Sequence, residues 1–271
     1  MTNACNPEKT TFDPRQYWEQ RLERHEGLVG VGYTSLGRHY NHWLYRLRRI
    51  VFFRCLKPLK LDWQQQRVLD VGSGTGFYLR LWKELGVLSP QGCDLTDVAV
   101  KRLCRLFPEC QIRQLDLTGA DVLPCSTYDV ISVFDVLFHI VDDSGFKQAL
   151  HNIYAALRPG GLFVFTDNFV HGEAIRSGHQ VCRPLADISS MLLGCGFSIE
   201  KRTPVFITMN GPLDSNSRVY RWAWKQLSRL LHRSEALGYL IGLVLFGTDW
   251  VLTGVLSESP TTELMICRKS G

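Results

Sequence analysis

The chain has 271 residues, of which 45% are hydrophobic and 21% are charged. This composition is ordinary for a globular protein and excludes a chain that is disordered throughout. The formal net charge of +5 is too small to indicate a nucleic-acid partner by itself. The length fits one large domain with a sizeable insertion.

Nine cysteines are scattered through the sequence. They include no C-x-x-C pair and their number is odd, which favours free thiols in a reducing cytoplasm over structural zinc. We therefore expect no metal and a cytoplasmic location, with membrane association left as an option. The polar N-terminus lacks the apolar core of a secretory signal, and residues 1–13 are expected to form a disordered tail.

Residues 14–60 are predicted to form an N-terminal helical cap. From Pro14, aromatic and apolar side chains recur every three or four residues, which predicts a first helix. A glycine-punctuated loop follows, and a second helix is expected over residues 38–56, ended by Pro58. These helices either pack against a sheet or cover a substrate pocket.

From residue 67 the sequence pattern alternates between strand and helix. Strands are expected at 67–71, 91–94, 111–115, 128–134, 162–166, 197–202 and 263–268. Helices are expected at about 78–85, 96–107, 143–157 and 184–195. This alternation predicts an α/β fold, with a mostly parallel sheet and helices on both of its faces.

The stretch Val68 to Phe77 reads as a buried strand, a turn of alternating glycines and the start of a helix. Such a junction points backbone N–H groups and a helix N-terminus at a ligand. Gly72 and Gly74 permit a close approach that a Cβ would block. A nicotinamide fingerprint would need its third glycine at position 77, where this chain has a phenylalanine.

The glycines at 72, 74 and 76, preceded by Asp70, resemble motif I of the class I S-adenosylmethionine-dependent methyltransferases. Three further stretches match that family: the acids Asp94 and Asp116 after the second and third strands, the segment 134–140 after the fourth strand, and the turn at 158–163. The resemblance implies a Rossmann-like sheet of seven strands, the last one antiparallel. It assigns residues 61–206 and 263–271 to the domain that binds S-adenosylmethionine.

The resemblance also implies a set of cofactor-binding residues. The ribose diol would bind Asp94, the adenine would contact Leu95, Asp116 and Leu117, and the methionine ammonium would bind the carbonyls of Gly72 and Phe134. The complete expected set is Asp70, Gly72, Ser73, Gly74, Gly76, Asp94, Leu95, Asp116, Leu117, Phe134 and Asp135.

Methyl transfer is an in-line displacement that depends on alignment, and some acceptors also need a base. The best candidate base is His139, just past the fourth strand at the open edge of the sheet. His171 and His179, after the fifth strand, are the alternatives. Other side chains that could orient an acceptor are Asn168, Tyr17, Tyr33 and Tyr40.

Residues 207–262 are predicted to be a helical insertion before the last strand. Cations recur along its first half as in a basic amphipathic helix: Arg218, Arg221, Lys225, Arg229 and Arg233. Its second half is apolar with one acid, Asp249. The alternatives are a lid, a homodimer interface, a peripheral membrane contact and a membrane span. The acid and the glycines disfavour the span.

The favoured function is a methyltransferase (EC 2.1.1 class) that moves a methyl group to an oxygen or nitrogen of a small metabolite, lipophilic acceptors included. No nucleic-acid partner is expected, because the base-stacking Asn/Asp-Pro-Pro-Tyr/Phe run and any appended RNA-binding module are lacking in the sequence. The alternatives are a non-catalytic scaffold or regulatory protein that binds S-adenosylmethionine, and a nicotinamide oxidoreductase, which Phe77 disfavours.

Overall fold

The computed structural model describes residues 12–271, so most of the predicted tail lies outside the described residues. Asp13 already belongs to the folded part. Its side chain accepts a hydrogen bond from the amide of Gln16 and so caps the first helix, α1 (Pro14–Arg24).

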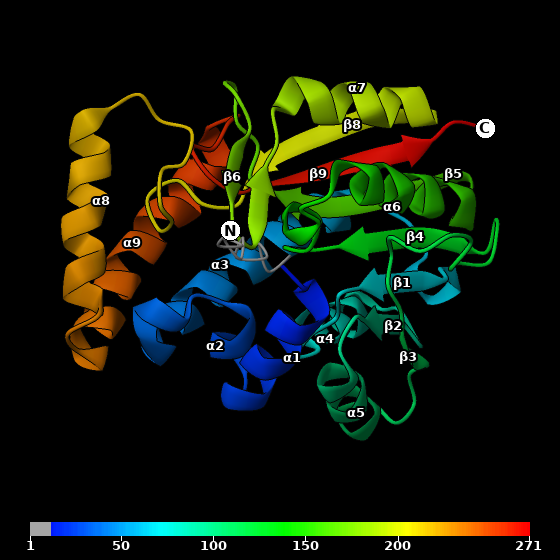
Figure 1. Ribbon diagram of the computed structural model, residues 1–271, viewed down its shortest axis with the longest axis horizontal. Helices are drawn as coiled ribbons and strands as arrows, with labels where there is room; N and C mark the ends of the chain where they lie inside the picture. Colours follow the sequence, from blue (N-terminus) through cyan, green and yellow to red (C-terminus); the bar gives the residue numbers. More distant parts are fainter. Residues whose placement is uncertain (1–11) are drawn as a thin grey trace, which may run out of the picture.

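The centre of the molecule is a seven-stranded sheet (Figure 1). Its strands are β1 (Val68–Val71), β2 (Gln91–Asp94), β3 (Ile112–Gln114), β4 (Tyr128–Val133), β5 (Leu157–Asp167), β8 (Phe197–Pro204) and β9 (Glu263–Lys269). The order is β3-β2-β1-β4-β5-β9-β8, with β9 antiparallel to both of its neighbours. The predicted fold class is confirmed.

Helices cover both faces of the sheet, because successive strand residues point to opposite faces. One face packs against α3 (Gly37–Leu56) and α4 (Phe77–Leu85) through a core that contains Trp82, Val130 and Val164. The other face packs against α6 (Asp143–Ala156) and α7 (Leu185–Cys195), around Ile131 and Phe165. Helix α5 (Asp97–Leu106) follows β2.

Two elements differ from the sequence prediction. A short helix, α2 (Leu28–Val31), lies in the region expected to be a loop. A small hairpin, β6 (Ile175–Ser177) and β7 (Gln180–Cys182), follows β5 where no strand was predicted. Three-residue strands with few apolar side chains give almost no periodic signal, which explains why the hairpin was missed.

Residues 207–262 contain α8 (Arg218–Leu231) and α9 (Glu235–Val255). Helix α8 covers the basic amphipathic stretch, and α9 is one continuous helix. Helix α9 is long and apolar enough to cross a membrane by length and composition, and 22% of its most apolar window is buried inside the protein. The division of the chain into cap, core domain and insertion stays a prediction.

Candidate active site

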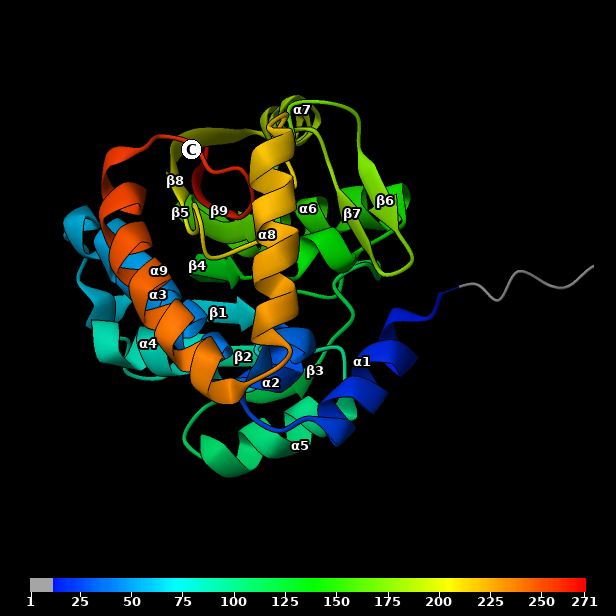
Figure 2. The same cartoon turned by 90° about the vertical axis from the view of Figure 1, so that its left-hand side faces the viewer.

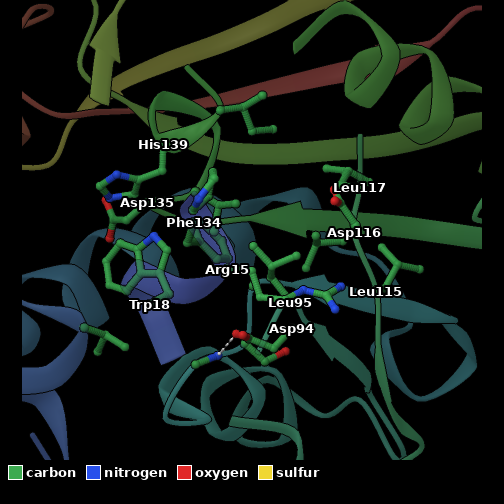
Figure 3. Close-up of a pocket in the computed structure, with 18 of the residues that line it drawn as sticks. Arg15, Trp18, Asp94, Leu95, Leu115, Asp116, Leu117, Phe134, Asp135 and His139 are labelled. Carbon is green, nitrogen blue, oxygen red and sulfur yellow. Dashed lines mark hydrogen bonds between the residues drawn. The ribbon is translucent and has the colours of Figure 1, made fainter. Parts of the chain in front are cut away.

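A cavity of about 560 Å³ lies at the carboxyl ends of β1, β2 and β4. This is the edge where the strand order reverses between β1 and β4, the usual place for a ligand in an open α/β sheet. Helix α1 lines the outer side of the cavity with Arg15, Trp18 and Leu22 and covers part of it. Figure 3 shows Trp18, Asp135 and His139 at one end, and Asp94 and Leu95 away from them.

The glycine turn forms one wall of the cavity. Gly72 and Gly74 have φ angles of 72° and 53°, which favour glycine. A Cβ on Gly72 would lie 2.3 Å from the side chain of Val136, and one on Gly74 would lie 2.9 Å from Val31. The amides of Gly72 and Ser73 donate to the carbonyl of Cys93 (2.8 and 2.9 Å), which anchors the turn to β2.

Asp94 closes β2 and lines the cavity beside Leu95. One carboxylate oxygen accepts from the Gly74 amide (2.9 Å), and the other accepts from the amide and hydroxyl of Thr96 (3.0 and 2.8 Å). Burial raises the pKa of Asp94, and these hydrogen bonds oppose the rise. Because a carboxylate has about four acceptor positions and three are used here, Asp94 can still accept from a ligand hydroxyl group.

The end of the cavity beyond β3 is formed by Leu115, Asp116, Leu117 and Thr118. Asp116 Oδ1 accepts from the amide and hydroxyl of Thr118 (2.9 and 2.7 Å). Its other oxygen is left as an acceptor at the cavity wall. Two leucines flanking an acceptor suit a flat aromatic ring that carries an amino group.

The opposite end is built after β4 by Phe134 and Asp135. The Phe134 ring stacks on Tyr78 with centroids 3.9 Å apart. Asp135 has a φ of 58°, uncommon for a residue with a side chain. Its carboxylate pairs with Arg48 of α3 at 2.7 Å and accepts from Thr166 at 3.0 Å, so two other elements fix this turn.

His139 lines the same end of the cavity and packs edge-on against Trp18 at 4.8 Å. Its Nδ1 lies 2.8 Å from the carbonyl of His179. Since a carbonyl only accepts, Nδ1 carries the proton and Nε2 is left with a lone pair. Burial, followed by nearby positive groups, lowers the pKa of His139 to about 4, so the ring is neutral at pH 7.

The structure thus places Gly72, Ser73, Gly74, Asp94, Leu95, Asp116, Leu117, Phe134, Asp135 and His139 around one cavity.

Two predicted cofactor residues lie outside the cavity lining. Asp70 is buried behind the glycine turn, where it accepts from Ser132 at 2.7 Å and burial raises its pKa to about 7. Gly76 is the N-cap residue just before α4, and a Cβ there would meet the Phe107 ring at 2.3 Å. Both residues therefore support the turn from behind.

The prediction that His171 faces the pocket is corrected. This residue lies outside the cavity lining, and its side chain is 56% exposed. Its Nδ1 pairs with Asp214 at 2.5 Å, and that hydrogen bond raises the pKa of His171. The chain between β5 and the small hairpin carries His171 to the surface, so its nearness to β5 in the sequence was misleading.

The remaining polar candidates have structural partners. The Tyr40 hydroxyl donates to the carbonyl of Met209 (2.8 Å), and Asn168 accepts from Thr262 (2.7 Å). The Tyr17 ring stacks on His179, whose carbonyl orients His139. Tyr33, on the segment between α2 and α3, is bound through its backbone: its amide donates to Asn41 Oδ1 (2.9 Å) and its carbonyl accepts from Asn41 Nδ2 (2.7 Å).

Several lining residues were not assigned to the site from the sequence: Trp18, Tyr45 and Tyr78, together with Arg48 behind Asp135. Arg48 lies on α3, and its side chain is only 8% exposed. Arg48 directly follows Leu47 and lies about one helical turn after Tyr45, and both of these side chains are buried. An arginine at this spacing from apolar residues of a helix is a sequence signal for a buried charge.

These residues fit S-adenosylmethionine in three places. The Asp94 carboxylate suits the ribose diol, the Leu95, Asp116 and Leu117 end suits the adenine, and the cradle at Gly72 and Gly74, which a Cβ would fill, suits the methionine portion.

Part of the chain is similar to known methyltransferases. Residues 68–161 match a family model described as a methyltransferase domain. The chain is 25% identical over 166 residues to a tRNA N(3)-methylcytidine methyltransferase of Schizosaccharomyces pombe. That match covers 57% of this chain and 49% of the relative, so the chain spans about half the relative's length.

Solved structures show the same fold at low identity. A phosphoethanolamine N-methyltransferase 2 of Haemonchus contortus, in complex with S-adenosyl-L-methionine, has a TM-score of 0.58 and 18% identity, covering 94% of this chain and 60% of that one. An S-adenosylmethionine-dependent methyltransferase from Mesorhizobium loti has a TM-score of 0.50 and 17% identity, covering 82% and 100%.

The fold is that of a Rossmann-like methyltransferase domain, and residues 68–161 match the family model of a methyltransferase domain. S-adenosylmethionine is the cofactor that the residues of the cavity fit. The relatives differ in their acceptors, so the class alone does not identify the molecule that receives the methyl group.

Proposed function

We propose that the protein transfers a methyl group from S-adenosylmethionine to an oxygen or nitrogen atom of a small, lipophilic metabolite. The observation that supports this acceptor class is the composition of the closed end of the cavity. Trp18, Tyr45, Tyr78 and Phe134 supply aromatic surface there, and His139 supplies one polar acceptor atom. A cavity of about 560 Å³ is of the size usual for small-molecule ligands.

The chain's residues would contribute alignment, dryness and one proton acceptor. When bound, S-adenosylmethionine supplies a methyl group that is already activated, so the protein's task is chiefly positional. Helix α1, through Trp18, keeps water from the reacting atoms. His139 Nε2 would accept the hydrogen bond of the acceptor's O–H or N–H group and would take that proton as the acceptor gains the methyl group.

His139 is suited to receive a hydrogen bond at neutral pH. A pKa of about 4 keeps Nε2 unprotonated. The same low pKa makes the imidazole a weak base, so orientation of the acceptor's hydrogen is the larger part of its proposed role. Replacement by glutamine keeps a polar side chain of similar reach and removes the imidazole.

A tRNA base is the second candidate acceptor, favoured by the similarity to the fission-yeast enzyme. A base in tRNA would have to be extruded from its stack to enter this cavity. The cavity described here is partly covered by α1. We therefore rank the small acceptor first and test both classes together.

The test is incubation of the full chain with S-adenosylmethionine labelled in its methyl group. Reactions receive a lipid extract, a polar metabolite extract or total tRNA, and the labelled product is identified by mass spectrometry. Label in a lipid-extract molecule that is reduced at least tenfold by His139→Gln supports the proposal. Label in tRNA alone contradicts it, and cofactor binding without turnover in any fraction favours the scaffold alternative.

A further inference from the structure

The insertion carries most of the exposed apolar surface of the described chain. Of the 17 large hydrophobic side chains that are exposed, 12 lie between residues 219 and 256. They belong to α8 and α9 or adjoin them: Val219, Trp222, Leu230, Leu237, Tyr239, Leu240, Leu243, Val244, Trp250, Val251, Val255 and Leu256. Figures 1 and 2 place α8 and α9 together on one side of the molecule.

The outer face of α9 is mainly apolar, and its exposed Thr248 donates to the carbonyl of Val244 (3.2 Å). Between Ala236 and Leu256 the sequence contains one charged residue, Asp249, and this residue is completely buried. The outward-facing Val244 and Val255 are 68% and 77% exposed. A contiguous apolar face of this kind on a folded protein indicates an interaction surface.

The inner face of α9 is fixed to the protein, with α3 lying behind it in Figure 2. Its first residue, Glu235, accepts from the amides of Arg38 and His39 at the start of α3 (2.9 and 3.0 Å). Gly242 lets the Trp43 ring approach to 2.5 Å from where a Cβ would be.

Asp249 and Arg54 fix the second half of α9. The Asp249 carboxylate accepts from the amides of Ile207, Thr208 and Met209 at 2.8, 2.8 and 3.1 Å. Arg54 donates to the Trp250 carbonyl and the Thr253 hydroxyl (3.0 and 3.1 Å). If α9 left the fold to span a bilayer, it would lose these polar contacts. The Asp249 carboxylate would then enter the hydrocarbon region without a hydrogen-bond partner.

A row of cations runs along α8 beside this apolar surface. Arg218, Arg221, Lys225, Arg229 and Arg233 are exposed, and none of them has an acidic partner within the described residues 12–271. Their three- and four-residue spacing places them in one stripe, with Trp222 and Leu230 in the adjacent exposed stripe. The opposite stripe, which includes Tyr220 and Leu231, faces the protein.

We propose that the outer face of α8 and α9 is a docking surface for an anionic lipid membrane. The apolar side chains enter the region between headgroups and acyl chains, and the cations of α8 bind the headgroup phosphates. The two chemistries lie side by side in the same hairpin. This proposal goes beyond the methyltransferase activity and does not depend on it.

The charge row argues against two other occupants. A symmetric dimer through this face would bring identical rows of cations together, which costs free energy. An RNA backbone would neutralise the row but would leave the apolar face of α9 uncovered. The cavity lining supplies no evidence for a lid, because no residue of 207–262 contributes to it within the described part of the chain.

The test is flotation of the full chain with vesicles of phosphatidylcholine alone or with 30% phosphatidylglycerol. Wild type is expected to float with the anionic vesicles and largely to remain behind with the neutral ones. Leu240→Glu/Val244→Glu should reduce binding at least tenfold. The matched control, Leu88→Glu/Leu193→Glu, changes two residues of similar exposure outside the hairpin and should bind like wild type.

The cations are tested by the triple variant Arg221→Gln/Lys225→Gln/Arg229→Gln. Each cation near an anionic surface contributes about a fivefold factor, so roughly a hundredfold loss of binding is expected. Arg105→Gln/Arg113→Gln/Lys147→Gln, with the same charge change elsewhere, should lose no more than about tenfold.

Four results would overturn the proposal. The first is equal flotation of the Leu240/Val244 variant and its control. The second is a dimer in sedimentation velocity without vesicle binding, and the third is binding of tRNA in place of vesicles. The fourth is resistance to alkaline carbonate extraction, which indicates a membrane span. Affinity for S-adenosylhomocysteine, measured on every variant, shows that a loss of vesicle binding does not come from unfolding.

Discussion

The ion pair between Arg48 and Asp135 gives the sharpest quantitative prediction. The Arg48 side chain is 8% exposed, the Asp135 side chain is 19% exposed, and their charged atoms lie 2.7 Å apart. Asp135→Asn removes the charge and keeps an oxygen that can accept from Thr166. Asparagine also tolerates the left-handed backbone at this position, so the substitution adds little strain.

The asparagine variant leaves a buried guanidinium without its counter-ion. Removing one partner of a buried pair costs about 3–5 kcal/mol, because the remaining charge stays desolvated. Arg48→Met should cost less, since the Asp135 carboxylate adjoins the cavity and can be hydrated there. The double variant should be more stable than Asp135→Asn alone by about 2 kcal/mol, because it strands no charge.

The assay is urea unfolding of the wild type, the two single variants and the double variant at one pH. The denaturant dependence should be shared, so that midpoints report stability. Two results would refute the argument that this ion pair holds α3 to the turn after β4. One is a free energy of unfolding of Asp135→Asn within about 0.5 kcal/mol of the wild type. The other is a double variant whose loss of stability equals the sum of the two single losses.

Two further predictions concern buried polar groups. The folded pKa of His139 is about 4, below the ordinary 6.5, so the unfolded chain takes up a proton here at a higher pH than the folded chain does. The free energy of unfolding should therefore fall by roughly 3 kcal/mol as the pH is lowered from 6.5 toward 4. His139→Gln should flatten this part of the stability–pH curve, and an unchanged slope would contradict the assignment. Asp249→Leu should destabilise the protein by about 3 kcal/mol, because three backbone amides lose their acceptor. Hydrogen exchange should accelerate at residues 207–209 and along α9. Unaltered exchange there would contradict the claim that Asp249 anchors α9 to residues 207–209.

The sheet could be predicted almost strand by strand because buried parallel strands are short apolar runs separated by turn residues. The run at 128–134 and the glycine turn at 72–76 show this directly. The antiparallel direction of β9 was predicted only from the resemblance, because hydrophobic periodicity does not show which strands pair or in which direction. The β6–β7 hairpin was missed because its strands are only three residues long, too short for a periodic pattern.

The cofactor end of the site was largely predictable because strand ends in this fold converge on one edge. Asp94, Asp116 and Phe134 each directly follow or close a strand, so their positions in the sequence fix their positions in space. The acceptor end was not predictable, because Trp18 and Tyr45 reach it from helices whose tertiary placement the sequence does not state. His171 shows the converse error, a residue near β5 in the sequence that the loop carries to the surface.

The most direct test of the central claim is calorimetric titration of S-adenosylhomocysteine into the full chain and into Asp94→Asn. We predict one site per chain in the wild type. Loss of charged hydrogen bonds to the ribose should weaken binding about 10- to 100-fold in the variant. Asp97→Asn, an exposed acid three residues further on, should bind like wild type. Absence of binding by the wild type, or equal affinity of wild type and Asp94→Asn, would contradict the account.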